Sequence, residues 1–388
     1  MSNDNIIITA LLKEDLQKPI LQDLAVFLEN GFYPDSKERW LKRFRFWWDA
    51  NPFLQDNESL GWILYNQENE SIEGFFGKIP VLFQHKESQY KAIASTSWYV
   101  SDEFRGRYST SLYLQYLREK DISIYLNTTP ITSIQKNLTK MGFNKVGGDD
   151  IENHMMIISL KKFLMFAGTL CGKFSESETG FKKSLLTTLS KVGLFGGKII
   201  PDIKKSSDVK PYLYSDTYRL QIIHDCSKFQ EHLQVHTISD SIVLSKDEKS
   251  LHWLLFSSEV ASLLQRVVCQ IFTQDGDYCG YIIYDIQPVG VEQTLRVREL
   301  QLLKYEIGIV KFLLTHLKYE AKRRSCAAVY IGLQGNCKEI DTMLHKLMIL
   351  SLKTENRYFV KFRKNVIPEV NPYDIFVPSD LDPDVGFL

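Results

Sequence analysis

The stretch that decides the fold of this 388-residue chain is Trp98-Tyr-Val-Ser-Asp-Glu-Phe-Arg-Gly-Arg-Tyr-Ser-Thr-Ser-Leu112. Its apolar start is typical of a strand, Arg105-Gly106-Arg107 indicates a turn, and the small hydroxyl residues that follow open a helix. A helix N-terminus leaves backbone N–H groups free and carries a positive dipole, and arginines add charge-assisted contacts. We therefore predict an anion-binding site between this strand and this helix.

The elements around this stretch are predicted from hydrophobic periodicity and from turn residues. An aromatic helix, Trp40–Trp48, ends before Pro52, because the residue before a proline avoids the helical region. Short polar turns between the next three strands predict an antiparallel meander, and Gly142 is expected to cap a helix. The expected elements after the aromatic helix are Gly61–Asn66, Ile72–Gln84, Tyr90–Val100, Gly106–Lys120, Ile122–Leu126, Ile131–Met141, Phe143–Val146 and His154–Leu160, the last completing the sheet.

The second half of the chain repeats this order about 190 residues further on, which predicts a duplication. Its expected elements are Leu251–Phe256, Val267–Phe272, Tyr278–Gln287, Leu295–Leu303, Glu306–Arg324, Ala327–Leu333 and Lys338–Leu347. The fold class is therefore α+β, with two tandem domains, each a mixed, mostly antiparallel sheet flanked by helices. We assign 1–160 to the first domain, 161–220 to a helical linker with a helix at Phe181–Lys191, and 221–388 to the second domain.

The segment from Val100 to Gly106 resembles motif A of the GNAT (Gcn5-related) N-acyltransferases, in which a strand ending in Val-x-Pro-x-x-Arg-Gly-x-Gly-x-Gly runs into the pyrophosphate-binding helix. Met141-Gly142-Phe143 is similar to the end of that family's next helix. The resemblance implies acetyl-CoA or another acyl-CoA as co-substrate. No metal is expected, because the sequence contains no metal-ligand spacing. The resemblance also implies that Trp98 and Val100 face pantetheine and that the pyrophosphate is held by Arg105, Gly106, Arg107, Tyr108, Ser109, Thr110 and Ser111.

The whole chain further resembles bacterial double-GNAT proteins, many of which are linked to sugar and cell-surface polysaccharide modification. This implies an amine acceptor on a small molecule such as a sugar nucleotide or a polysaccharide precursor. Three residues depart from the family pattern. Tyr108 and Thr110 stand in place of glycines, and Leu138 stands in place of the tyrosine that commonly acts as the general acid. The second copy has Leu302–Gly308 where the Arg-Gly turn would be, so we expect coenzyme A on the first copy alone.

Candidate acids and bases lie near the expected ends of the central strands, because amine acylation needs a proton acceptor there. In the first copy the candidates are Tyr99 and Ser133, with Ser97 and Asn127 beside them. Asp102 is in the right loop, although a solvated turn residue is the favoured interpretation.

In the second copy, Asp285 and Glu299 interrupt apolar strands, where an unpaired carboxylate is costly. A structural pair of Glu299 with Arg296 or Arg298 is the favoured interpretation. The alternative is a catalytic Glu299 that meets the amine in a cleft between the copies. Asp285 and the C-terminal Asp380 and Asp382 are further candidates for that cleft.

Composition limits the classes of partner. The 47 basic and 47 acidic side chains cancel, which argues against nucleic acid and against an aminoacyl-tRNA donor as in Fem-like enzymes. Six cysteines without a C-x-x-C pair, and no signal peptide, favour the cytoplasm. The basic and apolar linker is compatible with peripheral membrane contact, but a connector is favoured. The alternative to an enzyme is a non-catalytic GNAT-fold binding or regulatory protein.

Overall fold

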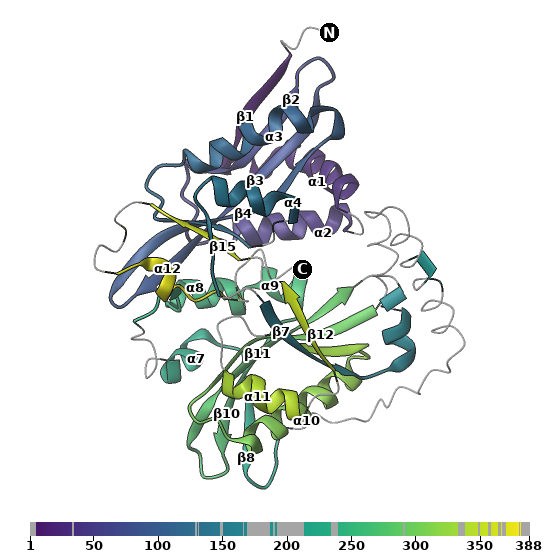
Figure 1. The fold of residues 1–388 in the computed structure, drawn as a ribbon, viewed down its shortest axis with the longest axis vertical. Coiled ribbons are helices and arrows are strands. Elements are labelled where there is room, and N and C mark those ends of the chain that lie inside the picture. The colour runs from purple at the N-terminus through teal and green to yellow at the C-terminus, as the bar shows by residue number, and fades with distance from the viewer. Residues whose placement is uncertain are drawn as a thin grey trace. The chain divides into compact units, whose positions relative to one another are not determined.

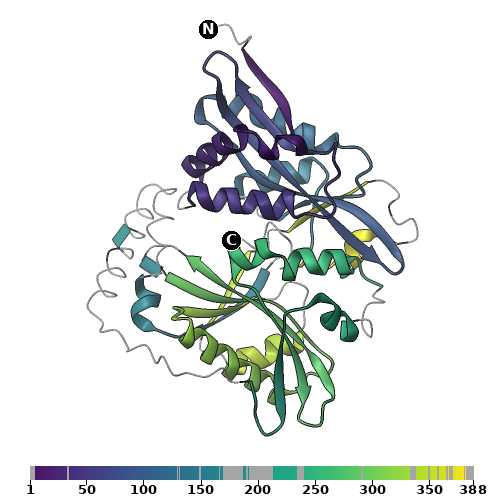
Figure 2. The ribbon, with the colours of Figure 1, turned by 180° about the vertical axis from the view of Figure 1, so that it is seen from behind.

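The computed structural model describes residues 5–32, 35–128, 130, 132–147, 150–165, 167–168, 187–188, 191, 213–233, 240–289, 292–332, 338–347, 350–355, 358–363, 366, 370–379 and 381. The chain forms two compact units, each assembled from separate segments (Figures 1 and 2). Unit 1 comprises Met1–Asp149, Asp225–Leu263 and Glu355–Leu388, and unit 2 comprises Asp150–His224 and Leu264–Thr354. Most of the expected linker helix Phe181–Lys191 lies outside the described residues.

The elements follow the labels of Figure 1. Those of unit 1 are β1 (Ile6–Leu12), η1 (Lys13–Gln17), α1 (Ile20–Gly31), α2 (Lys37–Phe44), η2 (Arg45–Asp49), β2 (Ser59–Asn66), β3 (Ser71–His85), β4 (Ser88–Val100), α3 (Asp102–Leu117), β5 (Ile124–Asn127), α4 (Thr132–Lys140), β6 (Asn144–Lys145), α7 (Cys226–Leu233), β9 (Val243–Leu244), α8 (Glu248–Leu251), η3 (His252–Phe256), α9 (Ser258–Leu264), β15 (Phe359–Phe362) and α12 (Pro372–Ile375). Those of unit 2 are β7 (Asp150–Ile157), β8 (Tyr218–Ile223), β10 (Val267–Thr273), β11 (Tyr278–Val289), β12 (Glu292–Leu302), α10 (Ile307–Arg323), β13 (Ala328–Ile331), α11 (Lys338–Leu347) and β14 (Leu350–Glu355).

The sheet of unit 1 has the order β1-β2-β3-β4-β5-β15-β6, and β9 pairs with β3. β4 and β5 run parallel, while the other ladders of this sheet in the described part of the chain are antiparallel. Adjacent side chains of a strand point to opposite faces. The ring centroid of Phe75 lies 6.3 Å from that of Trp48 in η2, and the ring centroid of Phe76 lies 5.2 Å from that of Tyr113 in α3. Thus η2 covers one face of the sheet and α3 covers the other.

The sheet of unit 2 has the order β14-β7-β13-β12-β11-β10-β8, with β12 and β13 parallel. Apolar residues of α10 and α11, such as Leu313, Leu317 and Leu344, share a core with Ile282 and Val297 of the sheet. The order β10-β11-β12-α10-β13-α11 repeats the order β2-β3-β4-α3-β5-α4 of unit 1. The predicted duplication and the predicted α+β fold class are therefore confirmed.

One strand prediction was wrong about the sheet it joins. The strand expected at His154–Leu160 is β7, and it pairs antiparallel with β13 of unit 2 rather than completing the sheet of unit 1. The place beside β5 is taken by β15, from near the C-terminus. Alternation of side chains specifies that a segment is a strand and which face is buried, but it does not specify the neighbouring strand.

The two aromatic helices were predicted as equivalent, and both continue into a π-helix. α2 runs into η2, and α8 runs into η3. They lie together in unit 1, where the Trp253 indole N–H donates to the Phe46 carbonyl at 2.8 Å and the two rings are 5.5 Å apart. The second repeat therefore contributes this helix to the core of unit 1.

The helix after β4 begins earlier than expected. α3 starts at Asp102, directly after its N-cap Ser101, so Arg105, Gly106 and Arg107 lie inside the helix rather than in a turn. The acidic pair Asp102 and Glu103 explains the difference, because carboxylates in a first turn stabilise a helix N-terminus. The strand thus passes into the helix without a glycine-dependent turn.

Candidate functional site

β4 contains a β-bulge shortly before it runs into α3. The register with β3 shifts so that Phe76 faces both Ser97 and Trp98. Ser97 has a φ of 51°, in the left-handed region that extra residues of bulges occupy in some bulge types. Gly77 allows the strands to approach closely, because a Cβ at that position would lie 2.8 Å from Thr96 Cγ2. The bulge redirects the last part of β4.

β4 and β5 separate beside this bulge. The parallel ladder joins Ala92–Ala94 to Ile124–Leu126. Beyond it, Ser95–Val100 has no ladder partner on β5 among the described residues. The Tyr116 hydroxyl of α3 lies at the point of separation, 2.8 Å from the Ile93 carbonyl and 2.9 Å from the Leu126 carbonyl, and it accepts the Leu126 N–H at 3.1 Å. A side chain thus lies where the ladder ends, and we name the region beyond it, between Ser95–Val100 and the end of β5, the β4–β5 slot.

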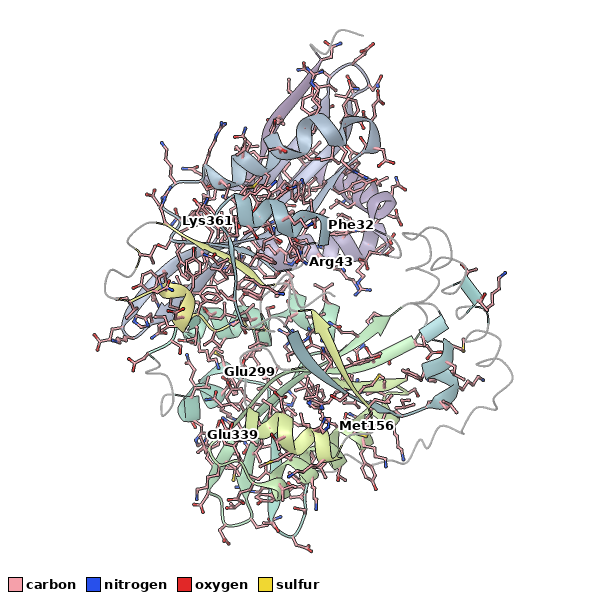
Figure 3. The ribbon with its side chains drawn as sticks, in the orientation of Figure 1. Phe32, Arg43, Met156, Glu299, Glu339 and Lys361 are labelled. Atoms are coloured by element: carbon pink, nitrogen blue, oxygen red, sulfur yellow. The ribbon has the colours of Figure 1, made fainter. Side chains whose placement is uncertain are left out.

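The predicted pantetheine-facing residues lie on one face of β4 and the predicted catalytic Tyr99 on the other. Trp98 packs on Tyr113 of α3, with ring centroids 4.9 Å apart, and Val100 belongs to the same core. Tyr99 instead contacts Phe27 and Phe32, the latter labelled in Figure 3, with centroids 5.2 and 5.6 Å away. Trp98 and Val100 are therefore brought to the α3 side of the sheet, and Tyr99 is not.

The N-terminal end of α3 carries charges of both signs. Arg105 forms an ion pair with Asp102 at 2.6 Å, and its Nε donates to the Val100 carbonyl at 3.3 Å. The Ser101 hydroxyl donates to the Glu73 carboxylate at 2.8 Å, so this N-cap side chain does not cap the helix. The N–H groups that an α-helix leaves free precede Arg105 here. A phosphate at this end would have to draw Arg105 away from Asp102.

The remaining predicted phosphate-binding residues follow along α3. A Cβ at Gly106 would meet no atom within 4 Å, so this side of the helix is open. The Arg107 guanidinium lies 5.2 Å from the Tyr108 ring, which packs near Phe104 and the core. The Ser109 hydroxyl donates to the Arg105 carbonyl at 2.6 Å, whereas Thr110 is exposed and Ser111 half-buried. Their backbone N–H groups lie within the helical ladder.

Sequence reasoning missed Tyr113. Its side chain is fully buried beside Asn127, which ends β5. Burial raises the pKa of Tyr113, and the neighbouring Asn127 side chain offsets part of that rise. In the sequence, Tyr113 belongs to the apolar stripe of a helix, so nothing distinguishes it from a core residue. Leu138, at the family's acid position, is 1% exposed and packs in the same core.

Unit 2 repeats the bulge and the strand separation but not the charges. The register of β11 and β12 shifts beside Arg298, and the parallel ladder with β13 ends at Val297. The N-cap of α10 is Glu306, which accepts a hydrogen bond from the Tyr218 hydroxyl at 3.0 Å. At the helix positions of Arg105 and Arg107 of α3, α10 has Val310 and Phe312, so the two arginines have no counterpart there. The absence of a pyrophosphate site from the second copy stays a prediction.

Asp285 is a structural residue, and its suggested role at an acceptor amine is corrected. It is fully buried and accepts from Arg266 at 2.7 Å and from Arg298 at 2.8 Å. Burial alone would raise the pKa of Asp285, but the two guanidiniums hold it below its ordinary value of 3.8. Glu299, labelled in Figure 3, accepts a hydrogen bond from the Tyr281 hydroxyl. Its catalytic role stays a prediction.

Three predicted residues are placed incompletely. Ser133 lies in the first turn of α4, and its side chain is not among those described. Asp380 and Asp382 lie outside the described residues.

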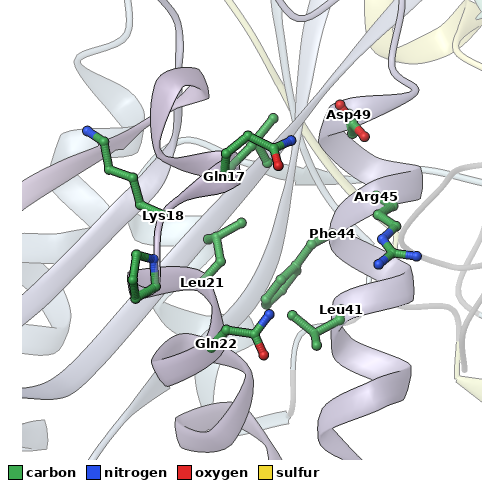
Figure 4. A pocket seen from close by; sticks show the side chains of 10 residues that line it. Gln17, Lys18, Leu21, Gln22, Leu41, Phe44, Arg45 and Asp49 are labelled. Carbon is green, nitrogen blue, oxygen red and sulfur yellow. The ribbon is translucent and has the colours of Figure 1, made fainter.

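A separate pocket of about 400 Å³ lies in unit 1 between η1, α1, α2 and η2 (Figure 4). Leu21, Leu41 and Phe44 give it an apolar wall, and Lys18, Arg45 and Asp49 give it charges. Its lining residues include none from β4, β5 or α3, so this pocket is distinct from the β4–β5 slot.

The fold is similar to that of known N-acyltransferases. Crystal structures of Saccharomyces cerevisiae N-myristoyltransferase with bound myristoyl-CoA match with a TM-score of 0.57 and 11% identity, covering 100% of this chain and 86% of that chain. A second such structure, with bound myristoyl-CoA and inhibitors, matches with a TM-score of 0.56, 13% identity and coverage of 100% and 87%. An Enterococcus faecalis V583 protein, described as a probable N-acyltransferase, matches with a TM-score of 0.50, 10% identity and coverage of 92% and 72%. At these identities the likeness establishes the fold, which is the GNAT fold expected from the sequence.

No family model and no curated protein matches this sequence. None of the helices in the described part of the chain combines the length and the apolar character needed to cross a bilayer.

Proposed function

We propose that this protein is an acyl-CoA-dependent N-acyltransferase, and that the acyl-CoA binds unit 1 in the β4–β5 slot and against the start of α3. The observation that carries the proposal is the bulge at Ser97, where β4 leaves β5 and then runs directly into α3. The backbone of Ser95–Val100 presents groups that an extended chain with amides, such as pantetheine, pairs with as an added strand does. The likeness to N-acyltransferase folds supports the same proposal.

The diphosphate is proposed to lie at the start of α3. Because the helix begins at Asp102, the free N–H donors belong to Asp102 and Glu103, and Arg105 and Arg107 supply the positive charge. The competing ion pair of Arg105 with Asp102 is exposed, and exposed pairs contribute about 0–1 kcal/mol. Replacing Asp102 by a phosphate as the partner of Arg105 therefore costs little free energy.

The acceptor is proposed to be an amine, whose neutral nitrogen attacks the thioester carbonyl. Tyr99, Ser133 and Glu299 stay candidates for the groups that handle its proton. A sugar nucleotide or a polysaccharide precursor stays the acceptor class implied by the sequence resemblance.

A second candidate function is a binding protein that holds acyl-CoA without transferring the acyl group. The observation that favours it is Leu138, because the side chain that replaces the family's acid is apolar and buried in the core. The two functions share the β4–β5 slot and differ in turnover.

Calorimetric titration of the full chain with coenzyme A tests the proposal. We expect one coenzyme A per chain, because α10 of unit 2 has Val310 and Phe312 at the helix positions where α3 has Arg105 and Arg107. Release of free thiol from acetyl-CoA and myristoyl-CoA, measured with and without a panel of amines, then separates the enzyme from the binding protein. No heat and no thermal shift at millimolar coenzyme A would refute both functions.

A further inference from the structure

Tyr113 carries a buried hydroxyl that forms no well-aligned hydrogen bond within the described part of the chain. The side chain is 0% exposed, and in the part of the chain that the structure describes no group meets the distance and angle of a hydrogen bond to its Oη, although the Asn127 side chain lies near enough to lower the pKa of Tyr113. A buried hydroxyl without a partner costs free energy, whereas a phenylalanine would fill the same space without that cost. An unsatisfied buried group in a native structure therefore requires an explanation, and a ligand that supplies the missing partner is one.

The position of Tyr113 indicates which ligand. Its ring lies 4.9 Å from Trp98, just past the bulge of β4, and its polar neighbour Asn127 ends β5. β4 and β5 thus each contribute one neighbour of Tyr113. Phe76 and Phe143 enclose the ring on other sides, with centroids 5.2 and 6.2 Å away. The Tyr113 side chain therefore packs against both strands that border the β4–β5 slot.

Two other tyrosines of the same core show what a structural hydroxyl does here. The Tyr116 hydroxyl bonds to the main chain of Ile93 and Leu126, and the Tyr125 hydroxyl donates to the Glu119 carbonyl at 3.1 Å. Both hydroxyls are satisfied by the protein itself. The Tyr113 hydroxyl differs from them, and it stays protonated at neutral pH because burial raises its pKa.

We infer that the Tyr113 hydroxyl donates a hydrogen bond to the thioester sulfur of the bound acyl-CoA and stabilises the thiolate that leaves. This inference rests on the proposed function. The amine nitrogen bonds to the acyl carbon as the C–S bond breaks, the electron pair of that bond stays on sulfur, and the proton lost by the amine passes to solvent. Tyr113 keeps its own proton throughout. It supplies a donor in a core where the family's acid position holds Leu138.

The thiol pKa of bound coenzyme A tests the inference without knowledge of the acceptor. Thiolate absorbs in the ultraviolet, so the absorbance of the complex with saturating coenzyme A is measured against pH for the wild-type chain and for Tyr113→Phe. We expect Tyr113→Phe to raise the thiol pKa by about one to two units, because a hydrogen bond to a charged group is lost. The matched control is Tyr125→Phe, which removes a hydroxyl at the far end of α3 and should leave the thiol pKa unchanged.

The outcomes separate the inference from the proposed function. A wild-type chain that binds no coenzyme A would refute the proposed function, and this inference with it. A Tyr113→Phe chain that binds coenzyme A with the wild-type thiol pKa would refute the inference and leave the proposed function standing. A rise of equal size in Tyr125→Phe would also refute it, because the effect would then reflect a general disturbance of the core.

Discussion

Tyr116 and Tyr113 are one helical turn apart on α3, and their hydroxyls have opposite energetic consequences for the fold. Tyr116→Phe should lower the free energy of unfolding by about 1–3 kcal/mol, because the Leu126 N–H and two buried carbonyls lose their partner. Tyr113→Phe should leave it unchanged or raise it, because its hydroxyl has no hydrogen bond to lose among the described residues. Urea denaturation of the ligand-free chain measures both. Equal destabilisation by the two variants would contradict this assignment.

The ion pair between Arg105 and Asp102 leads to two opposite effects on coenzyme A affinity. Arg105→Ala should weaken binding about ten- to a hundredfold, because a charge-assisted contact to phosphate is lost. Asp102→Asn should tighten binding about two- to fivefold, since the competing carboxylate is removed. Calorimetry at low salt measures both changes.

Arg118→Ala is the matched control, because Arg118 is exposed at the opposite end of the same helix. Its affinity for coenzyme A should equal that of the wild-type chain. If Asp102→Asn weakens binding, the phosphates do not approach Arg105 as proposed.

Among single residues, the sequence indicated which side chains lie near the candidate site better than it indicated what each side chain contacts. Trp98 and Val100 were expected on one face together, and alternation along a strand placed them there. The ion pair of Arg105 with Asp102 was not predicted. Residues three apart face each other only within a helix, and the helix was not expected to include Asp102. Tyr113 was missed because an unsatisfied hydroxyl can be recognised only from three-dimensional neighbours.

Among the elements of unit 2, one buried carboxylate, Asp285 of β11, links Arg298 of β12 to Arg266, which directly precedes β10. Asp285→Asn should lower the free energy of unfolding by about 3–5 kcal/mol at neutral pH, because it leaves Arg266 and Arg298 buried without their counter-ion. The guanidiniums hold the pKa of folded Asp285 below its unfolded value, so its contribution is full at neutral pH and is lost as the pH falls through the folded pKa. The difference in the free energy of unfolding between Asp285→Asn and the wild-type chain should therefore become smaller at acidic pH.

Denaturant unfolding at neutral and at acidic pH checks this expectation. Asp275→Asn is the control, since this exposed carboxylate lies in the turn between β10 and β11 and should have little effect at either pH. A difference for Asp285→Asn that does not change with pH would show that the loss is not electrostatic.

Element types were predicted more reliably than element ends. The strands β2, β3 and β4 extend the expected ranges by at most two residues at either end, because alternation and polar turns define them. The start of α3 was placed four residues too late, because the Arg-Gly pair was given more weight than the acidic residues before it. Gly142 has a φ of 85° and caps α4 as predicted.

At the scale of the whole molecule, duplication was predictable and the exchange of strands was not. The repeat of element order identifies two copies, but each sheet is completed by a strand from a distant part of the chain, β7 in unit 2 and β15 in unit 1. Local patterns carry no information about such long-range pairing. The described structure therefore divides the sequence into interleaved segments, whereas sequence reasoning gave contiguous ones.

We propose above that coenzyme A occupies the β4–β5 slot and the start of α3. Hydrogen–deuterium exchange of the full chain, with and without saturating coenzyme A, tests it most directly, because a ligand that pairs with backbone groups slows their exchange. We expect slower exchange in residues 95–104 and no change in the equivalent segment of unit 2, residues 298–308. Protection of 298–308 with 95–104 unchanged would contradict it.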